Sequence, residues 1–534
     1  MRLKTTIIVF CLEALSMTTF AQTPPPPLRF QKESLGEMPP DVVKTVIGPN
    51  SSHVLFVVQR RLHQQVKQLV MVDGRPGPEH DGIGEGGPVF SPDGKHVAYG
   101  AKNGARWVLV VDGQPGPEYD GNAKVVFSPD SRRVAYCALT RSEMIVVVDG
   151  APGPEYDGIG EGTPLFSPDS KRVAYAAKRG DKWTFVVDGQ PGTEYDRIGW
   201  GASIFSPDSK HVVYIAWRGA KQLIVVDGQP GPYYDEIAAH SPNSSSDGKR
   251  VAYAARKGDK WMTVVDGRPG PAYDAVGNPI FSPDGMCVAY AAVVGTKQLA
   301  VLDGQAEPLC DGVSEPVFSP DGKRVAYGAM NGSKWVMVVD RQRGPEHDGI
   351  GGGGPVFSPD GRRMAYIAVK GNKMIVVVDG QQGLAYDGIA DGDPVFSLDS
   401  KRIGYAAKKD VRWTMVVDGL PGPEYDEVNN LVFDPDGRRV AYCAKNGSKW
   451  VVIVDGRPGQ PYDGIGEGSP VFSPDGRHVA YLAWKGERMV VLVDGQAGPE
   501  CDRVVKGGPT FHTAGILEYL ALINGNNYRI KYAL

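Results

Sequence analysis

The 534-residue chain is poor in cysteine and histidine, and neither residue follows a metal-binding pattern. One of the six cysteines, Cys11, lies in an apolar N-terminal segment, and the odd number left, 6 − 1 = 5, argues against a framework of disulfides. The nine histidines show no metal-ligand spacing, and the chain has neither a Gly-x-Ser-x-Gly elbow nor a P-loop. We therefore expect no catalytic residues, no bound metal and no cofactor.

An excess of charge of either sign is also absent. The 58 Lys and Arg residues nearly balance the 62 Asp and Glu residues, and the net charge is −4. A nucleic-acid partner is not expected, because it normally demands a basic face. Hydrophobic residues make up 41% of the chain, too many for a disordered protein, and the 69 Gly and 43 Pro indicate a fold rich in tight turns.

A long apolar run occurs only at the N-terminus. Two basic residues precede a mostly apolar stretch, Thr5 to Phe20, and Ala21 completes a small-residue cleavage sequence. This order predicts a signal peptide over residues 1–21 and an exported protein, periplasmic or extracellular, without membrane insertion after cleavage. A membrane anchor is the alternative, disfavoured because the run is short and interrupted by Glu13.

What the chain has in abundance is one unit repeated about every 37 to 39 residues. The segment Phe90–Tyr99 reads Phe-Ser-Pro-Asp-Gly-Lys-His-Val-Ala-Tyr. A degenerate copy starts at Ser244, and the others start at Ile47, Phe127, Phe166, Phe205, Phe281, Phe318, Phe357, Phe396, Phe433, Phe472 and Phe511. A period in this range is typical of stacked supersecondary units that cannot bury an apolar face alone.

Residues 87–121 illustrate the pattern within one unit. Turns are predicted at Ser-Pro-Asp-Gly, at Asn103-Gly104 and, as a type II turn, at Gln114–Pro117. The continuous apolar run of the third strand predicts burial on both faces. The predicted strands are 88–90, 97–101, 107–111 and 118–120. Four antiparallel strands in about 40 residues predict an all-β fold and a propeller blade.

The motif is clearest from Phe318 to Tyr327, where it resembles the WD-repeat-like Pro-Asp propeller repeat of the TolB-like propeller superfamily. Exported TolB-like proteins carry that repeat. The resemblance covers nearly all of residues 47–534 and implies a β-propeller, although the chain lacks the separate α/β domain of a TolB-like protein. It implies no particular activity, because propellers host many unrelated functions.

The last copy is incomplete. Twelve copies run through a fourth strand, whereas the thirteenth, from Phe511, ends at Leu534 without one. The segment Leu28–Ser34, upstream of the first copy, can supply that strand by pairing with the C-terminus.

The number of copies bears on how the chain is divided. Propellers typically have about four to eight blades. Two tandem propellers of about six and seven blades are therefore favoured, and one large ring is the alternative. The favoured division is a Pro-rich segment with the closing strand at residues 22–46, a first propeller at 47–274 and a second at 275–534.

Aspartate recurs at three positions of most units, illustrated by Asp93 in the first turn, Asp112 after the third strand and Asp120 in the fourth. Clustered carboxylates can bind calcium. Short Asp side chains also cap turns and satisfy backbone amides. We favour the structural role over calcium, because a catalytic group is needed once rather than twelve times.

Tryptophan recurs at the start of the third strand, and a basic residue precedes this position in eleven of twelve copies, Glu143 being the exception. Tryptophan beside a cation can stack on sugars, and it can equally pack between blades. The candidate sugar-stacking residues are Trp107, Trp183, Trp261, Trp335, Trp413 and Trp450.

The connectors from fourth to first strands vary most between copies. Gly82–Gly87 matches a dinucleotide fingerprint only formally, because no helix follows it. In propellers these connectors lie near the channel mouth, and loops on a rigid scaffold often carry function. The candidate binding residues are Glu85, Glu161, Trp200, Glu315, Asp391, Glu467 and Lys506.

The sequence thus favours an exported, non-catalytic β-propeller that acts as a binding or scaffold protein with a protein partner. Near-identical copies favour multivalent binding, because linked sites gain avidity without new contacts. A carbohydrate-binding, lectin-like propeller is the alternative. An enzyme with an active site at the channel mouth is a third class.

Overall fold

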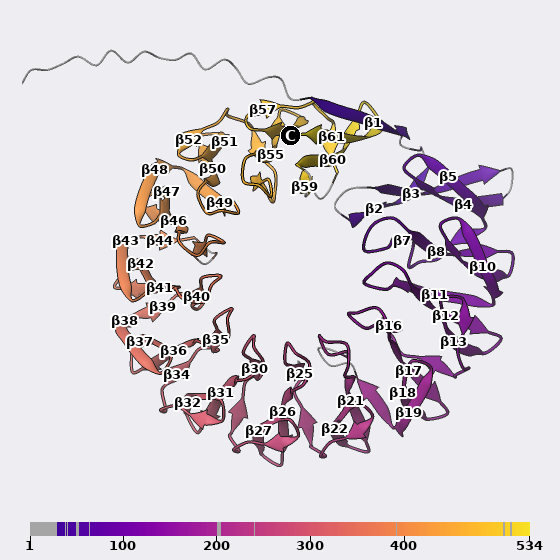
Figure 1. The fold of residues 1–534 in the computed structure, drawn as a ribbon, viewed down its shortest axis with the longest axis horizontal. Coiled ribbons are helices and arrows are strands. Elements are labelled where there is room, and N and C mark those ends of the chain that lie inside the picture. The colour runs from indigo at the N-terminus through magenta and orange to yellow at the C-terminus, as the bar shows by residue number, and fades with distance from the viewer. Residues whose placement is uncertain are drawn as a thin grey trace, which may run out of the picture.

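The computed structural model describes residues 29–534, except 38, 40, 50–52, 63–64, 200–203, 240, 391, 393, 506–507 and 513–514. The predicted signal peptide lies outside these residues. The described residues form thirteen β-sheets in one ring around a central opening (Figure 1). The prediction of an all-β propeller is confirmed, and each sheet is one blade. None of the described residues belongs to a helix long and apolar enough to cross a membrane.

The second blade shows the common plan. Its strands are β6 (Gly82–Ile83), β7 (Val89–Phe90), β8 (Val97–Asn103), β9 (Arg106–Val111) and β10 (Gln114–Tyr119). Both β6 and β7 pair with β8, so the first strand is split into two halves at the inner side of the ring. The third strand is buried through its middle, as the continuous apolar run predicts.

The two central strands repeat this plan around the ring. The second strands are β3 (Val54–Leu62), β8, β12 (Val134–Thr140), β17 (Val173–Arg179), β21 (Val213–Arg218), β26 (Val251–Lys257), β31 (Val288–Val294), β36 (Val325–Asn331), β41 (Met364–Lys370), β46 (Ile403–Lys409), β50 (Val440–Asn446), β55 (Val479–Lys485) and β60 (Ile516–Ile523). The third strands are β4 (Gln65–Val72), β9, β13 (Glu143–Val148), β18 (Lys182–Val187), β22 (Lys221–Val226), β27 (Lys260–Val265), β32 (Lys297–Leu302), β37 (Lys334–Val339), β42 (Lys373–Val378), β47 (Arg412–Val417), β51 (Lys449–Val454), β56 (Arg488–Val493) and β61 (Asn526–Ala533).

The core lies between blades. In the fourth and fifth blades, Ala174 and Phe185 pack in one cluster with Tyr214 and Leu223. The Phe185 and Tyr214 rings stack with centroids 4.6 Å apart. The small Ala of the Val-Ala-Tyr motif lets the sheets approach, and the Tyr fills the space that remains. Burying one such large side chain contributes roughly 1.5–3 kcal/mol.

The structure shows the single ring, the second of the two arrangements left open by the sequence. Two tandem propellers divided near Asp274 are not observed. Ala252 of the sixth blade and Val288 and Tyr290 of the seventh share one buried cluster across that point. The junction is therefore packed like its neighbours, and the chain continues around the ring without a break.

The ring is closed by the two ends of the chain. Strand β1 (Phe30–Glu37) pairs antiparallel with β61, with Phe30 opposite Tyr532 and Ser34 opposite Tyr528. It is the fourth strand of the last blade, which the C-terminal copy lacks. Leu35 of β1 is only 3% exposed and packs against Phe56 of the first blade.

A charged cluster accompanies this closure. Arg529 is 8% exposed and lies 2.8 Å from Glu33 of β1, 3.0 Å from Asp73 of the first blade and 3.2 Å from Glu518 of β60. Burial opposes the charge of Arg529, but the contacts with Glu33 and Asp73 raise its pKa. One guanidinium therefore connects the closing strand to the first and last blades.

Candidate binding surfaces

The Ser-Pro-Asp-Gly turn is held by its own side chains. Ser91 is fully buried, donates to Asp93 Oδ1 at 2.6 Å and accepts from the His96 N–H at 3.0 Å. The Asp93 N–H donates to Ser131 Oγ of the next blade at 2.9 Å. Hydrogen bonds from Ser91 and from the Lys95 N–H lower the pKa of Asp93 to about 2. The turn aspartate is therefore occupied in shaping the blade.

The aspartate after the third strand forms the next turn. Asp112 has φ +50° and Gly113 φ +78°, the positive angles that a two-residue hairpin turn requires. Asp112 accepts from the Val97 N–H at 2.9 Å and lies 2.7 Å from His96 Nδ1. The type II turn predicted at Gln114–Pro117 is wrong, because these residues belong to outer strand β10, which carries an irregularity after Pro115.

The basic residue that opens the second strand binds its blade to the next. Arg363 Nε donates to Asp379 at 3.0 Å and its Nη1 donates to the Lys401 carbonyl at 2.6 Å. Its guanidinium lies 5.3 Å from the centroid of the Phe396 ring in the next blade. The same contacts are made by Arg133, Arg172, Arg250, Arg324, Arg402 and Arg439.

Acid is expected to destabilise the ring through these turns. Asp93 and Asp208 each have a pKa lowered to about 2, first because a serine hydroxyl donates to them. An unfolded Asp titrates near ~3.9. Between these values the unfolded chain binds more protons, so stability present above about pH 4 is lost as the pH falls towards about 2. Urea midpoints measured at pH 7, 4 and 2.5 test this, and a midpoint that stays constant below pH 4 would contradict it.

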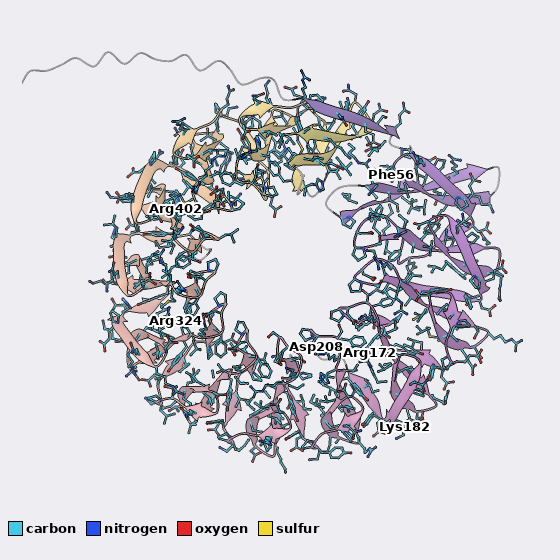
Figure 2. The ribbon with its side chains drawn as sticks, viewed as in Figure 1. Phe56, Arg172, Lys182, Asp208, Arg324 and Arg402 are labelled. Atoms are coloured by element: carbon cyan, nitrogen blue, oxygen red, sulfur yellow. The ribbon has the colours of Figure 1, made fainter. Side chains whose placement is uncertain are left out.

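The fourth-strand aspartates are ion-paired at the outer side of the ring. Asp81 accepts from Lys67 Nζ and from the Gly104 N–H, each at 2.6 Å. Lys182 makes the equivalent contact with Asp196 and lies at the outer margin in Figure 2, whereas Asp208 lies near the inner margin. Among the described residues, no group of three or more His, Cys, Asp or Glu side chains is arranged to hold a metal ion. Calcium binding stays an untested alternative.

The third blade departs from this pattern, because Glu143 stands where the other eleven of the first twelve blades have a basic residue. The neighbouring Glu155 raises the pKa of Glu143. Asp157 keeps its bond from the Gly180 N–H at 2.6 Å. Two carboxylates therefore lie together where a salt bridge occurs in the other blades.

Glu143→Lys is expected to stabilise the protein, because it removes the repulsion between the carboxylates of Glu143 and Glu155 and supplies a cation for Asp157. Exposed ion pairs are weak, so a rise of Tm on the order of 1 °C is expected in differential scanning fluorimetry. Lys182→Glu in the next blade is the reciprocal control and should lower Tm by a similar amount. A lower Tm for Glu143→Lys would show that the lysine–aspartate ion pair of the other blades does not form in the third blade.

The tryptophans are half-buried in the blade walls. Trp183, Trp413 and Trp450 pack against clusters between neighbouring blades. Cations of the second strands cover three of the rings: Arg256 lies 5.9 Å from the Trp261 centroid, Lys408 5.8 Å from Trp413 and Lys445 5.6 Å from Trp450. Trp107 and Trp335 are also partly buried. Packing is therefore one role of these rings, and sugar stacking by them stays a prediction.

The predicted acidic residues lie in loops that divide the first strand. Glu85 is exposed between β6 and β7, where the Gly84 N–H donates to the Gly100 carbonyl at 2.9 Å. Glu161, Glu315 and Glu467 are exposed at the equivalent place. These loops belong to the innermost strands of the ring (Figure 1). Trp200, Asp391 and Lys506 lie outside the described residues.

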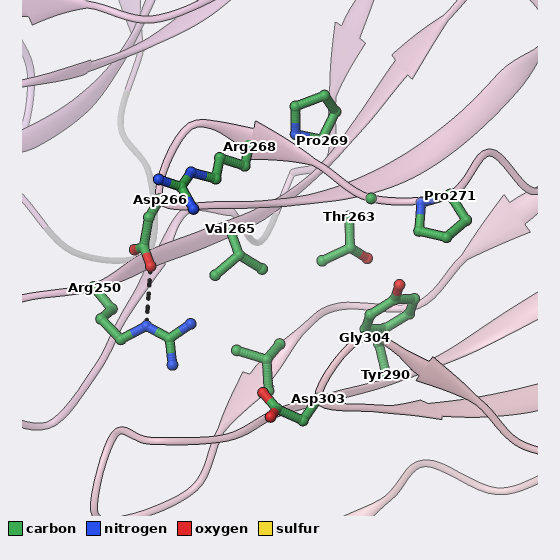
Figure 3. Close-up of a pocket in the computed structure, with 12 residues that line it drawn as sticks. Arg250, Thr263, Val265, Asp266, Arg268, Pro269, Pro271, Tyr290, Asp303 and Gly304 are labelled. Carbon is green, nitrogen blue, oxygen red and sulfur yellow. Dashed lines mark hydrogen bonds and ion pairs between the residues drawn. The ribbon is translucent and has the colours of Figure 1, made fainter.

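Grooves between blades are a feature that the sequence interpretation missed. Four have volumes of 480, 440, 520 and 490 Å³. Each lies between the end of a third strand with its following turn and the start of the next second strand, and Figure 3 shows the one between the sixth and seventh blades. Because equivalent positions line them, comparing the repeats position by position could have located them.

Solved structures resemble the chain at low sequence identity. No protein-family model matches the chain, and no curated protein matches it. It is similar to the crystal structure of a eukaryotic initiation factor, at 14% identity over 62% of this chain and 96% of that chain, with a TM-score of 0.30. The β-propeller domain of the Trilobed protease from Pyrococcus furiosus is 11% identical over 50% and 94%, with a TM-score of 0.25. TolB from Acinetobacter baumannii is 14% identical over 55% and 78%, with a TM-score of 0.21.

Proposed function

We propose that the chain is an exported, non-catalytic scaffold that binds a protein partner through equivalent grooves on one face of the ring. The observation that carries the proposal is the recurrence of one groove, with the same residue positions, at four blade junctions. Linked equivalent sites give avidity even when each binds weakly.

The chemistry of the grooves supports a protein ligand. The groove between the first and second blades combines Val70, Pro76 and Tyr99 with Arg75 and Lys95. Aromatic residues and arginine are enriched in protein interfaces. Several recurring Asp and Arg side chains of the groove walls, such as Arg250 and Asp266, are already paired with each other. The apolar, aromatic and remaining basic groups of the grooves are therefore the ones that can contact a ligand.

The test is a crosslinking pull-down with the chain from Gln22 to Leu534 as bait. Four glycines line the grooves with positive φ and open space at the Cβ position, so asparagine at Gly113, Gly228, Gly304 and Gly380 should fill the grooves without a clash. The matched control places asparagine at hairpin glycines that also have positive φ and open space, Gly104, Gly219, Gly295 and Gly371.

A partner held by the native chain and the hairpin control, but lost by the groove variant, supports the proposal. The inner loops would be the binding site if the groove variant kept the partner and a second variant lost it. This second variant has Gln in place of Glu85, Glu161, Glu315 and Glu467. Recovery of no protein would contradict the scaffold and favour the carbohydrate alternative, which a glycan array would then examine.

A further inference from the structure

The groove between the sixth and seventh blades differs from the other three described grooves. Its floor contains Thr263, at a position that is Val70, Phe185 or Met337 in the others. The second strand of its seventh blade is preceded by Met286 and Cys287. Ten other copies carry Lys or Arg at the first of these positions, and eleven carry Arg or His at the second. These departures change which polar groups are open to a ligand.

The Thr263 hydroxyl is buried beside that of Tyr290. Thr263 is 2% exposed, and its Oγ1 makes no hydrogen bond of ordinary geometry with a residue that the structure describes. Burial raises the pKa of Tyr290, and the nearby Thr263 hydroxyl opposes that rise. Figure 3 shows this hydroxyl and that of Tyr290 facing the space below Pro271. A buried polar atom without a partner is costly, so a ligand group that donates or accepts there is favoured.

Asp303 is an open carboxylate at the edge of the same groove. In the eleven other copies this aspartate accepts from the first N–H of the second strand and contacts an Arg or His. Within the described part of the chain, the side chain of Asp303 makes neither contact, and Cys287 stands where the eleven other copies have Arg or His. Asp303 is exposed and so remains accessible.

The remaining charges of the groove are then complementary to a dipolar ligand. Arg250 is occupied by Asp266 at 3.0 Å and by the carbonyls of Gly285 and Met286. Arg268 of β28 (Arg268–Pro269) makes no ion pair with another described residue. One cation and one anion are thus left, Arg268 on the outer strand and Asp303 on the opposite turn.

We propose that this groove binds the C-terminal lysine or arginine of a protein partner. The terminal carboxylate binds Arg268, the basic side chain binds Asp303, and the backbone N–H of the same residue donates to Thr263. One residue carries all three groups, and the groove volume of 480 Å³ accommodates one or two residues. This inference rests on the proposed function in that the ligand is a protein.

The test compares three peptides by isothermal titration on the chain from Gln22 to Leu534. Acetyl-Ala-Ala-Lys with a free carboxylate should bind, whereas its C-terminal amide and the norleucine analogue with a free carboxylate should each bind roughly tenfold more weakly, since each lacks one charge. Equal binding of all three peptides, or none by any, would overturn the inference. If free L-lysine bound as tightly as the peptide, the ligand of the groove would be a free amino acid and not the C-terminus of a protein, and the inference would be overturned.

Variants test the residues. Cys287→Arg supplies the arginine that seven other copies carry at this position, and this arginine should occupy Asp303. The substitution should therefore weaken binding of the lysine peptide roughly tenfold without loss of thermal stability. Asp303→Asn should do the same, and Thr263→Val should weaken binding while leaving the protein folded. Unchanged affinity in Cys287→Arg and Asp303→Asn would exclude this site. If the peptide titrations show no specific binding, the pull-down with the groove variants still tests whether the chain binds a protein. The two proposals can therefore be rejected independently.

Discussion

Arg529→Met is expected to destabilise the ring by about 3–5 kcal/mol, because it leaves the carboxylates of Asp73 and Glu518 without the cation between them. Glu518 is 6% exposed, so water does not replace the guanidinium, and the carboxylate keeps only the weaker contact with the partly exposed Lys531. Arg529 also contacts Glu33 of β1, so the same substitution weakens the attachment of the closing strand. The measurement is the urea midpoint together with the rate of proteolysis near residues 30–37.

Lys531→Met is the matched control for this substitution. Lys531 lies on the same strand and contacts the same Glu518 at 3.2 Å, but its side chain is 40% exposed. An exposed pair contributes little, so a loss below about 1 kcal/mol is expected. Equal losses for the two variants would show that the buried guanidinium has no special part in ring closure.

Gly74→Ala is expected to have the second large effect, again at the junction between the first and last blades. Gly74 has φ +75°, and a Cβ built there would lie 2.2 Å from the backbone oxygen of Leu35 in β1. The methyl group would have to push the closing strand out of place. We expect loss of the paired β1, measured by hydrogen exchange of its amides, and a lower unfolding midpoint.

Gly113→Ala isolates the effect of backbone conformation from that of the clash. Gly113 has nearly the same angle, φ +78°, but nothing lies within 4 Å of its Cβ position. Its substitution should cost only the left-handed backbone penalty, roughly 1–2 kcal/mol. If Gly74→Ala and Gly113→Ala lowered the unfolding midpoint equally, the close contact of Gly74 with β1 would not contribute to the stability of the closed ring.

The blade itself could be predicted because each copy carries its own folding signals. Ser91, Asp93 and Gly94 form one turn through contacts within five residues, and the apolar run from Val108 to Val111 specifies a buried strand. Even here a local choice was missed. Both Asp112-Gly113 and the following Pro-Gly pair are turn sequences, and the positive φ required at two successive positions decides for Asp-Gly.

The candidate site was less predictable. Glu85, Glu161, Glu315 and Glu467 were expected in connectors between the fourth and first strands, and they lie in loops that divide the first strand itself. The division depends on where Gly82 and Ile83 pair with β8, which the local pattern does not reveal. The groove between the sixth and seventh blades combines Thr263 and Asp303 from different copies, and the pattern within one copy does not show that the two residues line the same groove.

By itself, the sequence determined the all-β class, the repeated four-stranded blade and the need for a closing strand, because these follow from contacts within one copy or from counting the copies. The tertiary structure decided that thirteen blades form one ring, through packing such as that of Ala252 against Tyr290 at each junction. It also decided which polar groups stay open. A carboxylate such as Asp303 is free or paired according to what the neighbouring strand places beside it, and that depends on contacts between segments distant along the chain.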